Sequence, residues 1–210
     1  MTSTDDLIRS LASTAGTRPR GVSHQTALAV TSAAALACAL LLVFSVVGIR
    51  QDFIDMAVRM PFAFKVLYSC TLVAGAAVVA FYTATPGASS TAWYAMLPAV
   101  IFLACGAIFD PTGFPIMGRT DAAVAICVGR ILFLSLPAMI FIFIFMRQGA
   151  PTQLRLAGAV VGLLSGSVGA LAYALACRND GTAFVAIWYA AACGIMATIG
   201  AIVGRRVLRW

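Results

Sequence analysis

Hydrophobic residues in this chain gather in long runs that short polar breaks separate. Six runs approach or exceed the roughly 20 apolar residues that a helix needs to cross a bilayer. They cover residues 26–48, 61–83, 92–109, 122–146, 152–177 and 182–203. The runs lack the alternation of barrel strands, and hydrocarbon admits only helices or closed barrels. The pattern therefore predicts an all-α polytopic membrane protein with six transmembrane helices.

The breaks divide the chain into a polar tail, residues 1–25, and a six-helix domain, residues 26–210. Asp5, Asp6, Arg18 and Pro19 stand where a cleavable signal peptide would have its apolar core, so we expect the tail to remain attached. No break is long enough for a soluble domain. The break at residues 178–181, Arg-Asn-Asp-Gly, predicts a very tight turn between the fifth and sixth spans.

Composition supports a membrane protein and argues against an enzyme. Hydrophobic residues make up 62% of the chain and charged residues 10%, against roughly 25% charged in soluble domains. This balance excludes a soluble or disordered protein. The acidic residues are all Asp, and there is one His, so the chain holds little material for acid–base or metalloenzyme chemistry. We expect no catalytic residues and no direct contact with nucleic acid.

Basic residues predict the orientation, because cytoplasmic loops carry the excess of Lys and Arg. One side holds eight: Arg9, Arg18, Arg20, Arg147, Arg155, Arg205, Arg206 and Arg209. The other side holds five: Arg50, Arg59, Lys65, Arg119 and Arg178. Both termini are therefore expected in the cytoplasm. Lys65, just inside the second span, is expected to extend its ammonium group to the lipid headgroups.

The fifth span carries a glycine at every fourth position, Gly158, Gly162 and Gly166. Such a row lets two helix backbones approach closely. We expect it to pack against another helix of the same chain, with a homo-oligomer contact as the alternative.

Two of the six cysteines are candidates for chemistry. Cys127 lies about 8 Å into the fourth span, at ~1.5 Å per residue, and Cys177 ends the fifth span on the same face of the membrane. The two thiols can therefore meet. Arg130 is on the same helix face as Cys127, and Arg178 follows Cys177, so positive charge favours the reactive thiolate. The pair is a candidate redox or soft-metal site, for a transient ion rather than a constitutive cofactor, with Cys105 as a candidate third ligand.

The tail predicts a short amphipathic helix near its start. Ser3 or Thr4 can cap this helix, Asp5 and Asp6 favour its positive end, and an apolar stripe follows. The stripe consists of Leu7, Ile8 and Leu11, with Arg9 beside it. A partner groove, the membrane surface and plain disorder remain alternatives for this segment.

Several stretches together resemble the NrsF-type membrane anti-sigma factors. They are residues 5–12, 50–52, 61–62 with Lys65, 150–151, 173–177, Phe184, 188–189 and 208–210. The resemblance implies a six-span protein of the bacterial inner membrane that holds an extracytoplasmic-function (ECF) sigma factor inactive. It implies that the tail binds the sigma factor through Asp5, Asp6, Leu7, Ile8, Arg9 and Leu11. It also implies that Cys127 and Cys177 sense heavy metals or oxidants from the periplasmic side.

One position departs from the family pattern, and two other functions compete. Many relatives carry a His before the cysteine that ends the fifth span, where this chain has Ala176. A small transporter or metal exporter would need polar residues at the membrane midplane, which the sequence lacks. A membrane thiol redox protein would need a CxxC motif or paired loop cysteines, which are also missing.

Overall fold

The computed structural model describes residues 3–14, 23–85, 90–118, 123–149 and 151–209. All regular structure in these ranges is helical. A short helix α1 (Thr4–Thr14) precedes α2 (His24–Leu42), which continues as a π-helical turn, Val43–Val47. After α3 (Phe53–Ala57) come α4 (Met60–Thr83), a 3-10 segment Ser90–Met96 with α5 (Leu97–Ile108), α6 (Val124–Gln148), α7 (Leu154–Tyr173) and α8 (Thr182–Val207).

Six of the described helical segments are long and apolar enough to cross a membrane, as the sequence predicts. They span Gln25–Val47, Met60–Thr83, Thr91–Ile108, Val124–Gln148, Leu154–Tyr173 and Thr182–Val207. The fifth span differs most from its expected range, because it ends at Tyr173 rather than at Cys177. Residues 174–176 form a turn there, and the chain folds back over the end of the bundle.

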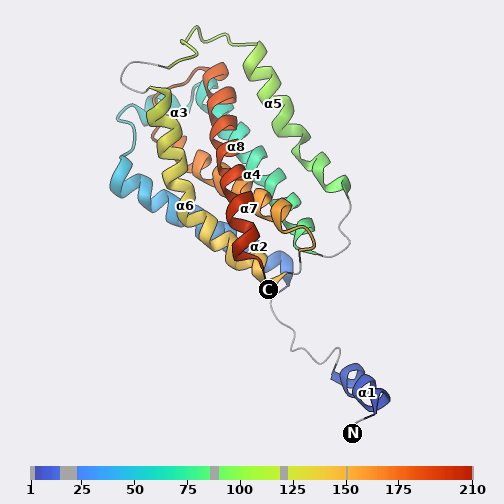
Figure 1. The fold of residues 1–210 in the computed structure, drawn as a ribbon. Helices are drawn as coiled ribbons and strands as arrows, with labels where there is room; N and C mark the ends of the chain where they lie inside the picture. The colour runs from blue at the N-terminus through green and yellow to red at the C-terminus, as the bar shows by residue number, and fades with distance from the viewer. Residues whose placement is uncertain (1–2, 15–22, 86–89, 119–122, 150, 210) are drawn as a thin grey trace.

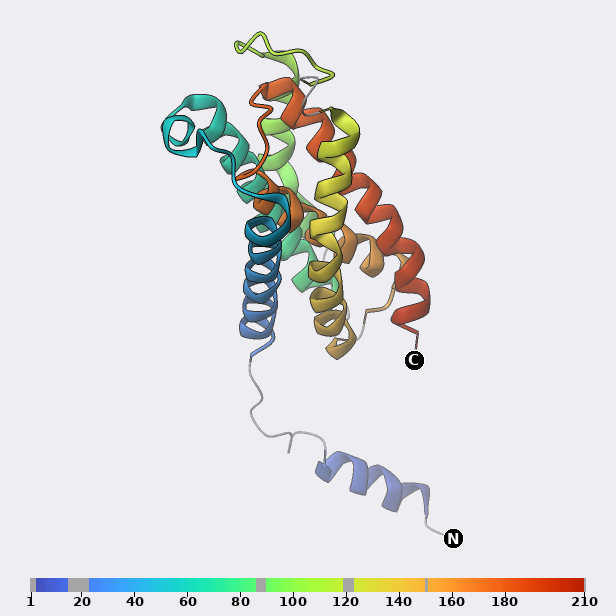
Figure 2. The same ribbon diagram turned by 90° about the vertical axis from the view of Figure 1, so that its left-hand side faces the viewer.

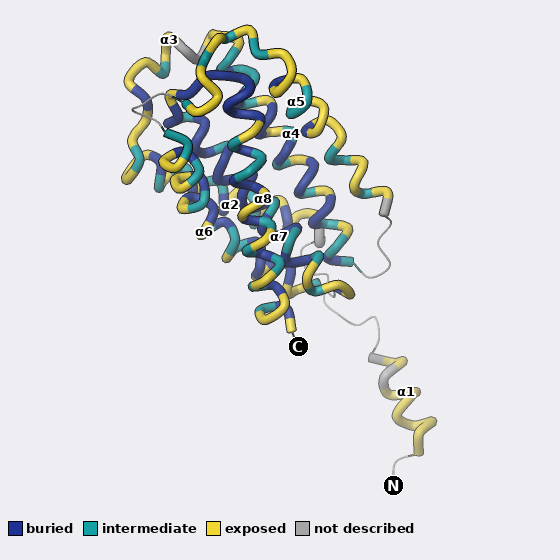
Figure 3. Tube along the Cα trace, turned by 45° about the horizontal axis from the view of Figure 1, so that its top comes forward, coloured by how far each residue is buried: buried dark blue, intermediate teal, exposed yellow. Residues whose placement is uncertain are grey.

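Helix α7 forms the centre of the bundle (Figure 1). It packs against α8, α6, α4 and α2, and it is the most buried of the six spans. Its small side chains explain this position, since Gly, Ala and Ser let several helices approach one axis. Figure 3 shows buried residues running through the middle of the bundle, whereas α1 and much of α5 are exposed.

The glycine row of α7 faces α8. A Cβ atom on Gly158 would overlap the carbonyl oxygen of Gly200, and one on Gly162 would overlap the carbonyl oxygen of Met196. A Cβ atom on Gly166 would lie 3.1 Å from Cα of Cys193. The two backbones therefore touch along the row, in the close intramolecular contact that the spacing predicts.

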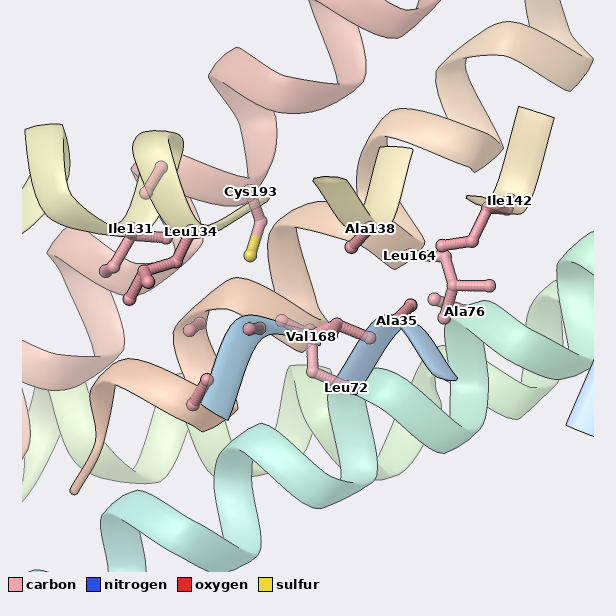
Figure 4. Packing of buried hydrophobic residues seen from close by; sticks show 14 of the residues in the cluster. Ala35, Leu72, Ala76, Ile131, Leu134, Ala138, Ile142, Leu164, Val168 and Cys193 are labelled. Carbon is pink, nitrogen blue, oxygen red and sulfur yellow. The ribbon is translucent and has the colours of Figure 1, made fainter. Parts of the chain in front are cut away.

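Side chains from five spans meet around this central pair in the apolar core (Figure 4). Ala35 comes from α2, Leu72 from α4, Ile131 from α6, Val168 from α7 and Cys193 from α8. Alanines alternate with branched residues here, so the helices interdigitate at close range.

The first turn of α2 and the last turn of α8 lie at one end of the bundle, and Figure 2 shows α1 beyond that end. Ser3 starts α1, because its hydroxyl accepts a hydrogen bond from the backbone N–H of Asp5 at 3.3 Å. The side chains of Leu7 and Ile8 are 57% and 58% exposed, so α1 presents unpaired apolar surface. The side chain of Leu11 and residues 15–22 lie outside the described part of the chain.

Candidate functional site

The segment between α7 and α8 is buried, although it is a loop. Cys177, Asn179 and Asp180 are all buried at the end of the bundle opposite the termini, and Arg178 is exposed. Buried loop backbone needs hydrogen-bond partners that secondary structure does not supply. The expected tight turn at residues 178–181 is therefore a buried loop whose backbone groups need hydrogen-bond partners from other helices.

Cys127 and Cys177 lie side by side in this buried region. Their Sγ atoms are 3.9 Å apart, and neither residue is exposed. The Tyr173 hydroxyl donates to Cys127 Sγ at 3.5 Å, and Asn179 Nδ2 lies 3.6 Å from the same sulfur. The Cys177 thiol donates to the Asn179 carbonyl oxygen at 3.7 Å. The proximity that the sequence predicts is thus observed, with the first turn of α6 and the α7–α8 loop supplying one thiol each.

A cluster of charged side chains binds the α7–α8 loop. Lys65 Nζ lies 2.8 Å from Asp180 Oδ1 and donates to the Cys177 carbonyl oxygen at 3.1 Å. Arg50 Nη1 contacts Asp180 at 3.0 Å and the same Cys177 carbonyl at 3.2 Å. The Arg50 guanidinium also pairs with Asp52, which is half exposed. Each buried ion therefore has an opposite charge, as a low-dielectric interior requires.

Comparisons with known proteins agree with this architecture. A family profile described as "NrsF: Negative regulator of sigma F" matches residues 11–210. The chain is 32% identical to the "Probable anti-sigma-F factor NrsF" of Azospira oryzae and 33% identical to the "Anti-sigma-F factor NrsF" of Caulobacter vibrioides. Each alignment covers 99% of both chains.

The chain belongs to the NrsF family. It is an anti-sigma factor, a negative regulator of a sigma factor, with a regulatory rather than a catalytic role. The profile begins at Leu11, so most of the predicted sigma-binding stretch precedes the matched range. No solved structure matches the chain.

Within this NrsF-family fold, the expectation that Lys65 reaches the headgroups is wrong. Its side chain is fully buried and points to Asp180, a residue 115 positions away. For an ammonium group this deeply buried, pairing with a carboxylate and a carbonyl oxygen is more favourable than extending the side chain to the headgroups. The sequence held the signal, because an ionisable residue within a span needs a partner.

The cations that bond the Cys177 carbonyl oxygen are Lys65 and Arg50, which the sequence did not single out. Of the pair that it did single out, Arg178 is exposed on the loop. Arg130 is also exposed, and it interacts with the Tyr173 hydroxyl that donates to Cys127. Its link to the thiol is therefore indirect.

Charge and hydrogen bonds at the loop act on the Cys177 thiol. The hydrogen bond with Cys127 and the positive charge of Lys65 together hold the pKa of the Cys177 thiol below its usual value, although burial opposes this shift. The hydrogen bond from Arg50 lowers the pKa of Asp52 to about 2, so this partner stays ionised. The buried Tyr189 hydroxyl lies close to Cys177.

The thiol pair fits two kinds of chemistry. Two ligands on one tetrahedral metal, at Zn–S distances of about 2.3 Å, have sulfurs about 3.8 Å apart, close to the 3.9 Å observed. A disulfide requires the sulfurs to close to about 2 Å. Cys105 is exposed on α5, so the expectation of a third ligand there is wrong. In the described ranges no three His, Cys, Asp or Glu side chains cluster as a metal site.

Proposed function

We propose that this anti-sigma factor sequesters an ECF sigma factor through its N-terminal tail and releases it when the Cys127–Cys177 pair meets a soft metal ion or an oxidant. The proximity of two buried thiols, with Sγ atoms 3.9 Å apart, carries this proposal. The pair is shielded from solvent, which explains how free thiols persist in an oxidising periplasm. No resident cofactor is required.

The tail is the element suited to bind the sigma factor. Helix α1 exposes Leu7 and Ile8, and an apolar face on a short helix fits a hydrophobic groove. Asp5 and Asp6 lie in its first turn, and Arg9 follows. Sigma factors present basic surface to DNA, so acidic residues at the rim of the contact set its register. Leu11 belongs to the same proposed contact.

The proposed setting is the bacterial inner membrane, with both termini in the cytoplasm. Six spans return the C-terminus to the side on which the chain enters, and the excess of arginine on that side favours the cytoplasm. The thiol pair, at the opposite end of the bundle, then faces the periplasm. A signal from outside reaches it without crossing the membrane.

Two signals suit the pair. A soft divalent ion replaces the two thiol protons and bridges both thiolates. Alternatively, the two thiols lose two protons and two electrons to an external disulfide or a peroxide, which is reduced, and a Cys127–Cys177 disulfide forms. Disulfide formation moves the α7–α8 loop toward the first turn of α6, because the sulfurs must close from 3.9 Å to about 2 Å. Metal binding leaves the sulfur separation almost unchanged, but it removes the Cys177 thiol proton and with it the hydrogen bond to the Asn179 carbonyl oxygen.

The charged cluster offers a route from the loop to the tail. Arg50 contacts the Cys177 carbonyl oxygen, and it lies three residues beyond the π-helical end of α2 at Val47. Helix α2 in turn leads through residues 15–22 to α1. The glycine contacts of α7 on α8, at Gly158, Gly162 and Gly166, provide a second route along the bundle, because packed interfaces tend to be bistable. Switching from 1:99 to 99:1 needs about 5.5 kcal/mol of differential binding.

The test is a transcriptional reporter of the sigma factor in cells that produce full-length variants. Deletion of residues 2–20 should give constitutive transcription with normal membrane insertion. The Cys127→Ser, Cys177→Ser double variant should repress normally and fail to respond to cadmium-like ions or oxidants. Cys70→Ser is the matched control, because Cys70 is exposed on the side of α4. A silent reporter in the deletion strain would remove the tail from the proposal, and normal induction in the double variant would remove the sensor.

A further inference from the structure

Arginines line a hollow at the end of the bundle where both termini lie. Arg155 is in the first turn of α7, Arg205 and Arg206 are in the last turn of α8, and Arg209 follows α8. Arg155, Arg205 and Arg209 line a cleft of about 790 Å³ together with Gln153, Leu154 and Leu156. The thiol pair lies at the other end of the bundle, so this cleft is unrelated to the proposed sensor.

The glycine contact between α7 and α8 forces these charges together. A Cβ atom on Gly204 would lie 2.6 Å from Cα of Gly158, so the two backbones touch one turn from the cleft. Arg205 directly follows Gly204, and Arg155 precedes Gly158 by three residues. The helix ends therefore cannot separate to relieve the repulsion between their guanidinium groups.

The cations of the cleft have no salt-bridge partner in the part of the chain that the structure describes. They are Arg155, Arg205, Arg206 and Arg209. The N-cap residue of α7, Gln153, makes no side-chain capping bond, so the first N–H groups of this helix also lack a cap. A cation in the first turn adds to the positive end of the helix dipole, which is unfavourable unless an anion binds there.

Apolar residues show what kind of anion fits. An adjoining hollow of about 340 Å³ shares Arg155, Arg205 and Arg209 and adds Arg206, Ala201 and Ile202. Ile202 is 66% exposed on the part of α8 that lies within the span. The site thus combines a cationic end with an apolar wall that runs into the membrane. We propose that it binds the phosphate headgroup of an anionic phospholipid, with an acyl chain along Ala201 and Ile202.

Bound in this way, the phosphate accepts hydrogen bonds from guanidinium groups and neutralises part of their charge. The lipid then relieves the repulsion between the ends of α7 and α8. Free inorganic phosphate offers the same acceptor oxygens but no acyl chain. It should therefore compete weakly, and this difference separates a lipid site from a site for a soluble anion.

The test measures binding of phosphatidylglycerol to the purified full-length protein in neutral detergent. Native mass spectrometry and thermal unfolding are the two measurements. Phosphatidylcholine is the neutral lipid control. Arg155→Gln and Arg205→Gln should each weaken phosphatidylglycerol binding by about tenfold, the loss expected for one charged hydrogen-bonded pair. Arg147→Gln is the matched control, because Arg147 is exposed in the last turn of α6 and lines neither hollow. It should change binding less than twofold.

Thermal unfolding of wild-type protein should shift upward with phosphatidylglycerol and stay unchanged with phosphatidylcholine or inorganic phosphate. Arg155→Lys, which keeps the charge, should bind with intermediate affinity if the cleft variants unfold early. Equal weakening in all three Gln variants would overturn the proposal, as would displacement of the lipid by inorganic phosphate. Unchanged lipid binding with a loss of sigma-factor capture in Arg155→Gln would assign the cleft to the protein partner instead.

Discussion

Lys65 Nζ and Asp180 Oδ1 lie 2.8 Å apart inside the bundle, although 115 residues separate them in the chain. Neither side chain is more than 2% exposed. The pair ties the start of α4 to the loop that carries Cys177, and Arg50 adds a second cation to the same carboxylate. The position of the thiol pair therefore depends on a cluster of charged residues that the spacing of the cysteines in the sequence does not reveal.

Removing the shared carboxylate should destabilise the protein more than removing one cation. Asp180→Asn leaves Lys65 buried without a negative partner and leaves Arg50 with Asp52 alone, and we expect a loss of about 3–5 kcal/mol. Lys65→Met leaves Asp180 paired with Arg50 and should cost less. Chemical unfolding of the full-length protein in detergent measures both changes. The control is Asp55→Asn, an exposed residue of α3, and equal midpoints for Asp180→Asn and Asp55→Asn would contradict this ranking.

The two thiols should react together with a reagent that bridges pairs of thiols. Phenylarsine oxide bridges neighbouring thiols, and Sγ atoms 3.9 Å apart are close enough to share one arsenic atom. We expect wild-type protein, and Cys105→Ser, to bind one such bridge. Cys127→Ser and Cys177→Ser should each lose it. Intact mass before and after treatment with a competing dithiol gives the stoichiometry, and retention of the bridge in either variant would separate the two cysteines.

Substitution in the glycine row should loosen the contact between α7 and α8. A methyl group at Gly162 overlaps the Met196 carbonyl oxygen, so Gly162→Ala must push two backbones apart. Overpacking of this kind costs about 1–3 kcal/mol. Gly194→Ala is the control, because Gly194 lies on α8, the other helix of this contact, and its added Cβ meets nothing within 4 Å. Because Ala favours a helix more than Gly does, Gly194→Ala should keep or raise the thermal midpoint, and an equal fall in both variants would contradict the packing explanation.

Asp110 should stabilise the start of α8. Its carboxylate accepts hydrogen bonds from the Thr182 hydroxyl at 2.9 Å and from the backbone N–H of Ala183 at 3.2 Å. Loss of such a cap in Asp110→Ala should cost about 1 kcal/mol. Partial burial raises the pKa of Asp110, but hydrogen bonds from Thr112, Thr182 and Ala183 outweigh it and lower the pKa.

The lowered pKa of Asp110 determines how its contribution to stability changes with pH. A carboxyl group whose folded pKa lies below its unfolded value of about 3.9 stabilises the fold above that pH. The contribution disappears as the pH falls through the folded pKa. Unfolding midpoints of wild type and Asp110→Ala should therefore converge in acid. A gap that persists unchanged below pH ~3 would show that the ionised cap is not its cause.

Much of the architecture follows from the sequence by itself. A bilayer demands an uninterrupted apolar run for each crossing, so six runs determined six spans, and polar breaks determined their order. The glycine spacing on residues 158–166 indicated a close helix contact, because residues four positions apart lie on the same face of a helix. The same geometry placed Cys127 and Cys177 at one membrane depth, although it did not define the groups that surround them.

Only the tertiary structure decided which charges meet. In a low-dielectric interior an ion is stable where an opposite charge reaches it, and that meeting depends on how distant helices pack. Local spacing assigned Arg130 and Arg178 to the thiols, whereas it gave no sign that Lys65 and Arg50 bond the Cys177 carbonyl oxygen. Lys65 and Asp180 each carry a charge that the sequence shows, but only the packing of α4 against α7 pairs them.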